Sequence, residues 1–384
     1  MIEETHTDPV EADVVIVGGG PAGCAAAFAL QGSGLKVLLV DKAVFPRDKT
    51  CGDSIPAHAL LGLENFSPGI YDAFLRQVVS LSFRSSALIF PNGSEFIVSW
   101  PLPGYVTERS KFDGFLLDRI IETTDVQVVT GLKVVDYQRT GSSLRLKTQS
   151  VEGKLGTNII TRYVIAADGA PSLAARKLAG IPPDPSAYGQ AVRCYFEDVE
   201  GVERQMEFVF YHPRFFPGYF WIFPMPGGRV NAGFGMPEKS RRKNGASLVT
   251  LFEQFREQHP VVRKMLENAR QVGELRGGMV PFAMRKQSWS GDGYLLTGDA
   301  ASLVDPVSGD GIMFAVRSGL LAGLAVRNGQ VSSYNGQVEK FIWNRMKSQR
   351  EIIRLLTFLP FLISWVSWLG RFSWFRTRIR KWIW

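Results

Sequence analysis

A cysteine and a glycine, Cys51 and Gly52, stand together inside the charged stretch FPRDKTCGDS (45–54). A solvated loop accounts for the charges, but not for this pair or for the apolar Phe-Pro at its start. An unperturbed thiol, with a pKa of about 8.5, is protonated at neutral pH and can donate a proton, whereas cations such as Arg47 and Lys49 favour a thiolate. The stretch predicts the rim of a site in which Cys51 either donates a proton or only packs against a bound group.

The segment GGGPAG (18–23) has the spacing G-x-G-x-x-G, between the apolar run DVVIV and an alanine-rich, helix-like run. In such a segment Gly18 allows a tight turn, Gly20 lets the backbone approach a pyrophosphate, and Gly23 lets the helix pack closely on the strand. The pyrophosphate then lies at the positive end of the helix dipole. Asp41 ends the next strand-like run, KVLLVD, where a carboxylate that binds ribose hydroxyls is expected. This region therefore predicts a dinucleotide site.

A second cofactor segment, TGDAASLVDPVSGDGI (297–312), precedes a long apolar helix-like run. Asp299 can accept hydrogen bonds from the ribityl hydroxyls of a flavin, and Gly309 and Gly311 would expose backbone N–H groups to the electron-rich edge of a reduced flavin. With AADGAPS (166–172), this segment resembles the second and third FAD motifs of flavoproteins with the para-hydroxybenzoate hydroxylase fold. The resemblance makes FAD the predicted cofactor. No second G-x-G-x-x-G is present, so a separate NAD(P)H domain is not expected.

Three further segments narrow the resemblance to the geranylgeranyl reductase family: FPRDKTCGDS, YVTERSKFDGFLLD and YFWIFPMPGGRVNAGFG. They are similar to the family's FPR-x-K-x-CG, R-x-x-FD-x-x-L and Y-x-W-x-FP segments, the last followed by N-x-G-x-G. The resemblance implies reduction of isolated C=C bonds in prenyl chains by reduced FAD. It implies FAD contacts at Ala22, Asp41, Cys51, Gly52, Arg109, Val134, Asp299, Gly311 and Ile312. It implies a prenyl pocket lined by Tyr219, Trp221, Phe223 and Pro224.

The aromatic segment suits such a substrate, because an isoprenoid carries no polar group along its chain and only an apolar tunnel can hold it. The alternative is that Tyr219, Trp221 and Phe223 are ordinary sheet core. Hydrogenation of an unactivated alkene needs a hydride, which flavin N5 can supply, and a proton from an acid in a dry site. Cys51 is the candidate catalytic residue. One departure from the family is Asp41 in place of the common Glu, which reaches less far toward the ribose.

The elements that must position these residues are those of an α/β body interrupted by a β-rich, aromatic region. We expect a Rossmann-type FAD-binding domain, an inserted and mainly antiparallel β-sheet domain that binds substrate, and a C-terminal helical segment. The expected boundaries are 1–80, 105–187 and 283–330 for the FAD-binding domain, 81–104 and 188–282 for the substrate domain, and 331–384 for the helical segment.

Composition limits the other functions. The net charge is +8 over 384 residues, but residues 339–384 contain ten Lys and Arg and two Asp and Glu, so the remaining chain is neutral and nucleic acid is not an expected partner. Three widely spaced cysteines without a C-x-x-C pair argue against a disulfide framework or a metal site. The N-terminus lacks a signal peptide, which predicts a cytoplasmic location.

The C-terminal residues 355–384 predict peripheral association with the cytoplasmic face of a membrane. The apolar run 355–369 contains Pro360 and is shorter than the roughly 20 residues of a membrane span. RFSWFRTRIRKWIW then mixes cations with Trp and Phe, a composition that suits the headgroup boundary. The alternative is a pair of helices that pack on the FAD-binding domain with their basic residues solvated.

Two other functions compete with a prenyl reductase. A flavin-dependent halogenase or aromatic monooxygenase could use the same fold, although halogenases carry W-x-W-x-I-P where this chain has Tyr219 and Phe223. A non-catalytic FAD-containing lipid carrier is the alternative of another class, and the intact PVSGDGI segment argues against it. The electron donor is expected to be NAD(P)H or a ferredoxin-like protein. The sequence does not distinguish among prenyl substrates.

Overall fold

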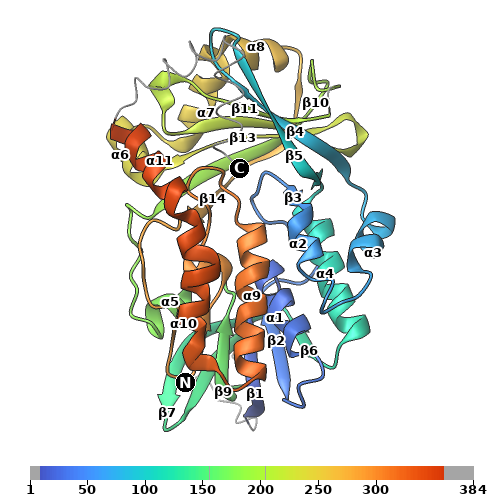
Figure 1. Cartoon of the computed structure of the whole chain (residues 1–384), viewed down its shortest axis with the longest axis vertical. Coiled ribbons are helices and arrows are strands. Elements are labelled where there is room, and N and C mark those ends of the chain that lie inside the picture. The colour runs from blue at the N-terminus through green and yellow to red at the C-terminus, as the bar shows by residue number, and fades with distance from the viewer. Residues whose placement is uncertain (1–8, 155, 204, 359–384) are drawn as a thin grey trace.

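Two sheets organise the computed structural model, which describes residues 9–154, 156–203 and 205–358. The first sheet is mainly parallel and lies in the lower half of Figure 1, with strand order β15-β16-β9-β1-β2-β6 and the antiparallel pair β7–β8 joined to β9 through β8. Its strands are β1 (Val10–Val17), β2 (Val37–Asp41), β6 (Gln127–Thr130), β7 (Leu132–Thr140), β8 (Ser143–Ser150), β9 (Ile159–Ala166), β15 (Ser290–Gly291) and β16 (Tyr294–Leu296).

The second sheet lies in the upper half of Figure 1 and has the order β14-β10-β13-β12-β11-β4-β5-β3. Its pairs are antiparallel except for the parallel pair β11–β4. Its strands are β3 (Ser54–Pro56), β4 (Leu81–Ile89), β5 (Glu95–Val106), β10 (Tyr188–Glu197), β11 (Glu207–Phe210), β12 (Tyr219–Pro224), β13 (Val230–Pro237) and β14 (Arg270–Pro281). The predicted fold class, a Rossmann-type domain with an inserted antiparallel sheet, is confirmed.

Helices cover both sheets. Their bounds are α1 (Pro21–Leu30), α2 (Ala57–Leu61), α3 (Ile70–Gln77), α4 (Arg109–Thr123), α5 (Leu173–Lys177), α6 (Glu238–Asn244), α7 (Leu248–Gln258), α8 (Pro260–Met265), α9 (Ile312–Arg327), α10 (Tyr334–Val338) and α11 (Lys347–Phe358). Single turns of 3₁₀-helix lie at Pro213–Phe215, Pro226–Gly228, Gly298–Ala301, Val331–Ser333 and Asn344–Met346, and a π-turn at Glu339–Trp343. No helix in the described residues is long and apolar enough to cross a membrane.

The core of the first domain forms around α1, whose ten residues are all buried. Proline at its first position starts the helix without losing an intrahelical hydrogen bond. Two glycines of α9 let the helices pack in close contact: a Cβ on Gly319 would lie 2.1 Å from the carbonyl oxygen of Ala22, and one on Gly323 would lie 2.6 Å from that of Ala26. The helix of the first cofactor segment, α1, therefore packs directly against α9, the helix that follows the second cofactor segment.

The second sheet has one face in a hydrophobic core and one face toward the FAD-binding domain. Phe220 and Ile222 of β12 are fully buried in a cluster with Phe252 and Phe255 of α7. Because side chains alternate along a strand, Tyr219, Trp221 and Phe223 point to the opposite face. The face that carries these three rings is called the pocket face below.

The structure departs from the expected domain boundaries at one strand. β3 lies inside the segment 1–80 assigned to the FAD-binding domain, yet it pairs with β5 in the second sheet. The chain therefore enters the substrate sheet directly after Cys51 and Gly52. The predicted membrane-associated segment, 355–384, falls outside the described residues from 359 on.

Candidate functional site

The turn after β1 is built as a phosphate-binding turn requires. Gly18 has φ +111°, and a Cβ there would lie 2.2 Å from the carbonyl oxygen of Ala167, at the start of the predicted third FAD motif. Gly20 caps α1, and no side chain accepts hydrogen bonds from the first turn of the helix. A Cβ on Gly23 would lie 1.8 Å from the carbonyl oxygen of Gly18. The free N–H groups of this turn fit a pyrophosphate.

Asp41 holds this turn in place. One carboxylate oxygen accepts a hydrogen bond from the backbone N–H of Gly19 at 2.6 Å, and the other accepts from that of Ala43 at 2.7 Å. A carboxylate has about four lone-pair sites, so the remaining ones can accept from ribose hydroxyls. Asp168, of the AADGAPS segment, instead accepts from the N–H groups of Leu173 and Ala174 at the start of α5.

A buried carboxylate joins two arginines beside the phosphate-binding turn. Asp113 forms a bidentate pair with Arg109 at 2.7 Å and a second ion pair with Arg47 at 2.9 Å. Burial lowers the pKa of Arg109, but Asp113 and the Cys51 thiol outweigh that effect and hold it above its ordinary value. A Cβ on Gly20 would lie 3.4 Å from the Arg47 guanidinium. Arg47 is therefore placed to meet an anion at this turn.

The second cofactor segment meets the opening stretch of the site. Asp299 pairs with Lys49 at 2.7 Å, and a Cβ on Gly311 would lie 3.5 Å from an Asp299 oxygen. The expected N–H cradle is partly used within the loop itself: the Gly309 N–H donates to the carbonyl of Asp305, and the Ile312 N–H donates to the carboxylate of Asp310. Burial raises the pKa of Asp310 to about 6.

Cys51 and Gly52 lie against the pocket face of the second sheet. A Cβ on Gly52 would lie 2.9 Å from the ring of Phe223 and 3.5 Å from the indole nitrogen of Trp221, so glycine allows this approach. The Tyr219 hydroxyl donates to the carbonyl of Ser308 at 3.2 Å, in the loop before α9. The structure thus brings the predicted pocket residues and the two predicted flavin segments together.

Not every predicted residue belongs to this group. Val134 lies in β7, where its side chain is buried in the core of the FAD-binding domain. Pro224 ends β12 and pairs in register with Val230, which belongs to the hydrophobic core, so the alternation along the strand places Pro224 on the core side and not on the pocket face. Ala22 lies in the first turn of α1, against Gly319 of α9.

Three buried polar residues at the site were not predicted. Asp53 and Asn231 are fully buried, and Glu207 is 8% exposed. Asn231 belongs to the N-x-G-x-G segment that resembles the family's, so the sequence marked this residue but did not indicate its role. In the sequence, Asp53 is indistinguishable from the other charges of its loop. Glu207 could not be recognised from the sequence, because only its register with Ser86 of β4 places it on the pocket face.

Glu207 adds an acid to the otherwise aromatic pocket face. Its carboxyl accepts a hydrogen bond from Ser86 at 2.8 Å. Burial raises the pKa of Glu207 to about 7, against the lowering effect of hydrogen bonds from Ser54 and Ser86. Burial also raises the pKa of Tyr219, and Tyr211, Asp305, Glu207 and Cys51 add to that effect. These side chains therefore lie within electrostatic range of one another.

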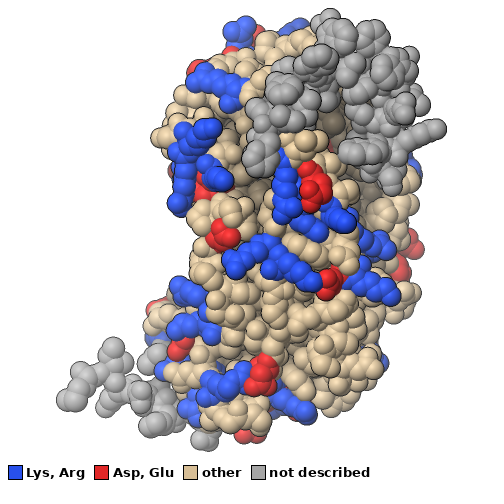
Figure 2. All heavy atoms as spheres, turned by 60° about the vertical axis from the view of Figure 1, so that its left-hand side comes forward, with Lys and Arg blue, Asp and Glu red and all other residues tan. Residues whose placement is uncertain are grey.

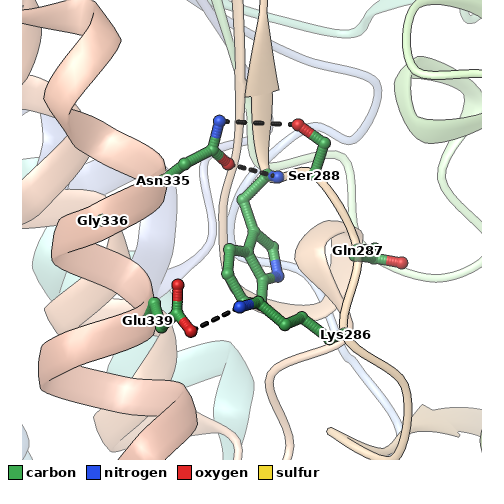
Figure 3. Close-up of a pocket in the computed structure, with 7 residues that line it drawn as sticks. Lys286, Gln287, Ser288, Asn335, Gly336 and Glu339 are labelled. Atoms are coloured by element: carbon green, nitrogen blue, oxygen red, sulfur yellow. Dashed lines mark hydrogen bonds and ion pairs between the residues drawn. The ribbon is translucent and has the colours of Figure 1, made fainter.

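A separate polar hollow of about 440 Å³ lies between α10 and the chain before β15 (Figure 3). Asn335 accepts hydrogen bonds there from the backbone N–H groups of Trp289 and Ser290, and Lys286 pairs with Glu339. None of the predicted site residues lines it, so it is no part of the candidate site. The described residues contain no group of three or more His, Cys, Asp and Glu that could hold a metal ion.

The surface does not mark the site with a single charge. Figure 2 shows Lys and Arg side chains interspersed with Asp and Glu on the side where α10 and α11 lie. Many of these are exposed pairs, such as Arg354 with Glu351 at 3.0 Å. Such pairs contribute little to stability.

This fold and this phosphate-binding turn define an FAD-dependent oxidoreductase, and comparisons with known proteins agree. A model described as FAD binding domain matches residues 11–325. A digeranylgeranylglycerophospholipid reductase of Methanopyrus kandleri is 35% identical over 322 residues, which cover 82% of this chain and 76% of its own. A menaquinone reductase of Mycobacterium tuberculosis is 32% identical over 319 residues, which cover 81% of this chain and 75% of its own.

Solved structures share the fold. A geranylgeranyl bacteriochlorophyll reductase-like protein from Thermoplasma acidophilum superposes with a TM-score of 0.76 at 22% identity, covering 90% of this chain and 87% of its own. A flavin-dependent brominase gives a TM-score of 0.74 at 19% identity, covering 97% and 93%. The chain belongs to the FAD binding domain family and, within it, to the geranylgeranyl reductase family; that resemblance and the FAD cofactor, both predicted from the sequence, are confirmed.

Proposed function

We propose that this flavoprotein saturates isolated C=C bonds of a prenyl chain or prenyl lipid. The observation that carries the proposal is the pocket face itself: Tyr219, Trp221 and Phe223 turn away from the sheet core, and the last two lie beside Gly52. An apolar aromatic surface of this kind holds a chain that has no polar group. The names of the relatives, which act on prenyl lipids and a prenylated quinone, support the same substrate class.

The residues present fit FAD. In this proposal the turn 18–23 holds the pyrophosphate with Arg47, Asp41 accepts from the ribose, and Asp299 accepts from the ribityl chain. When bound and reduced, FAD supplies a hydride to the double bond. The second sheet covers the reacting bond and excludes water, which would otherwise compete as a proton source.

Cys51 is the proposed proton donor to the second carbon of the bond. Its thiol forms a hydrogen bond with the guanidinium of Arg109. A guanidinium has only N–H donors, so the sulfur is the acceptor in this bond. The S–H is then left to face the pocket. Arg109 also stabilises the negative charge that remains on sulfur after the proton leaves.

The test is an anaerobic half-reaction. The purified protein is reduced, a geranylgeranyl lipid is added, and flavin reoxidation is followed together with a product mass gain of two hydrogens for each reduced bond. We expect reoxidation coupled to that gain. Hydroxylation or halogenation in air without reduction of prenyl substrates would instead favour the monooxygenase or halogenase function. Binding of FAD and lipid with neither reaction would favour a carrier.

Cys51→Ala and Cys51→Ser decide the role of the thiol. With FAD still bound, we expect Cys51→Ala to lower the rate of flavin reoxidation by about 10²-fold or more, the range of general acid catalysis. Cys51→Ser keeps an O–H at the same place and is expected to retain part of the rate. Full activity of both variants leaves Cys51 a packing residue only.

The donor of electrons and the route of the substrate complete the proposal. We propose reduction by NAD(P)H or by a ferredoxin-like protein at the rim of the cofactor site, to be distinguished by adding each donor to the oxidised flavoprotein. We also propose that residues 355–384 bring the protein to a lipid surface. Deletion of residues 371–384 tests this by co-sedimentation with liposomes, and unchanged binding would contradict it.

A further inference from the structure

Asn231 is a buried amide that uses every hydrogen it has. Its Nδ2 donates to the carbonyl oxygen of Cys51 at 2.9 Å and to the carboxylate of Asp53 at 2.9 Å. Its Oδ1 accepts from the indole Nε1 of Trp221 at 2.9 Å. An amide nitrogen and an indole N–H can only donate, so these partners fix the orientation of the amide. One side chain thus ties the proposed proton donor to an aromatic ring of the pocket face.

Asp53 completes the arrangement at an energetic cost. It is fully buried and has φ +62°, a left-handed conformation that is unfavourable for most residues other than glycine. Its Oδ2 accepts from Asn231 and, at 2.9 Å, from the hydroxyl of Tyr195. Its Oδ1 is buried with no hydrogen-bond partner among the residues that the structure describes. Strained and incompletely satisfied residues of this kind cluster where geometry serves function.

Charged groups reach Asp53 from two elements. Burial raises the pKa of Asp53 to about 6; hydrogen bonds from Asn231 and Tyr195, and then the cations Arg193 of β10 and Arg109 of α4, oppose that rise. Arg193 lies 4.4 Å from the ring centroid of Tyr195 and pairs with Asp48 at 2.6 Å. Both arginines therefore favour the ionised carboxylate, in addition to its two hydrogen bonds.

We propose that Asn231 and Asp53 are positioning residues that fix Cys51 against the prenyl pocket. The inference rests on the proposed function and extends it. Asn231 fixes the position of the Cys51 backbone relative to Trp221, because it bonds to both. Asp53 fixes the backbone conformation between Cys51 and β3. When Asp53 is protonated, on its free Oδ1, its Oδ2 becomes a neutral acceptor and both hydrogen bonds weaken.

The first test is Asn231→Ala in the FAD-loaded protein, with two readouts. Anaerobic flavin reoxidation gives kcat and KM for the geranylgeranyl lipid. Alkylation of Cys51 by iodoacetamide, followed by mass spectrometry, reports the position of the thiol without any turnover; Cys24 and Cys194 are buried and do not interfere. We expect kcat to fall about tenfold to hundredfold, as for a reacting group displaced by about 1 Å. The alkylation rate at Cys51 is expected to change by about threefold or more.

Asn335→Ala is the matched control. This asparagine also makes several hydrogen bonds, in its case accepting from two backbone N–H groups, at the polar hollow that contains no predicted site residue (Figure 3). We expect it to lower stability while kcat and the alkylation rate stay within about twofold of the wild type. If Asn231→Ala behaves in the same way as Asn335→Ala, the network is structural and the inference is wrong.

Tyr195→Phe provides a second variant that keeps the ring and removes only one hydrogen bond to Asp53. Loss of that bond raises the pKa of Asp53, so the acid limb of the pH profile of kcat and of Cys51 alkylation is expected to move to higher pH. An unmoved acid limb in a folded, FAD-loaded Tyr195→Phe protein would overturn the role of Asp53. If the wild type does not reduce prenyl substrates, the proposed function fails, and the alkylation readout still tests the positioning.

Discussion

At the scale of single residues, the candidate site contains carboxyl side chains that have little contact with solvent. Asp53 and Glu207 are buried carboxyls, Asp310 is a half-buried one, and desolvation raises their pKa values to about 6, about 7 and about 6. A purely structural core would place apolar groups there, because a buried carboxylate costs free energy unless it is fully paired. These residues therefore indicate that the interface between the two sheets is selected for chemistry as well as for packing.

The first prediction concerns the pH dependence of stability. The pKa of Asp53 is about 6 in the folded state and about 3.9 when unfolded. Between these values the folded state binds more protons, so the free energy of unfolding falls as pH rises, by on the order of 3 kcal/mol once pH exceeds 6. Urea unfolding of the wild type and of Asp53→Asn at pH 4.5 and 7.5 measures it. The wild type should lose more stability between these pH values than the variant; equal losses would contradict the prediction.

At the scale of elements, the nucleotide-binding half could be predicted from local pattern. The turn 18–23 and the helix-like runs that follow the first and second cofactor segments appear as expected, the two helices as α1 and α9, because glycine spacing and apolar periodicity are local properties of the chain. Asn231, Asp53 and Glu207 could not be placed in this way. Their roles depend on the register of β11 with β4 and on a loop that meets β13 from far away in sequence.

The packing of α1 on α9 gives the second prediction. A Cβ at position 319 would lie 2.1 Å from backbone, which cannot move without shifting the turn 18–23. We expect Gly319→Ala to lower the free energy of unfolding by about 1–3 kcal/mol, as overpacking does, and to weaken FAD binding. Thermal unfolding and FAD titration measure both effects.

Gly336→Ala is the control for this change. Gly336 lies in α10 with open space around its Cα, so alanine there should raise stability by up to about 1 kcal/mol through helix propensity. A Gly319→Ala protein that binds FAD as tightly as the wild type would show that the two helices adjust without disturbing the turn.

At the scale of the whole molecule, the stretch 45–54 fastens the two sheets to each other. Lys49 reaches Asp299 of the FAD-binding domain, whereas Asp48 pairs with Arg193 of β10 at 2.6 Å and with Arg276 of β14 at 2.7 Å. The charges of Arg47, Asp48 and Lys49, which read as a solvated loop in the sequence, are thus all in ion pairs, and those of Asp48 reach the second sheet. Cys51 and Gly52 are held between these pairs and β3.

The third prediction tests this fastening with Asp48→Asn. Arg193 is 3% exposed at its side chain and would lose its charged partner. We expect the free energy of unfolding to fall, by less than the roughly 3–5 kcal/mol of a fully buried pair because Asp48 is 30% exposed, and we expect faster amide hydrogen exchange at residues 45–54. Lys154→Ala, which breaks an exposed pair with Glu152, should change neither. Unchanged exchange in Asp48→Asn would mean that the stretch is held by other contacts.

The alternation of side chains along β12 separates the residues of the pocket face from those that form the hydrophobic core. Residues 219, 221 and 223 lie on the pocket face, and residues 220 and 222 lie in the hydrophobic core. If the proposed function holds, chain-length selectivity can be altered at the three pocket-face positions without disturbing the hydrophobic cluster on the other face. The same alternation means that β12 should not tolerate an insertion, because one added residue would move the pocket-face side chains into the core and the core side chains onto the pocket face. Variation within this enzyme group should accordingly appear as substitution along β12 and never as a change in its length.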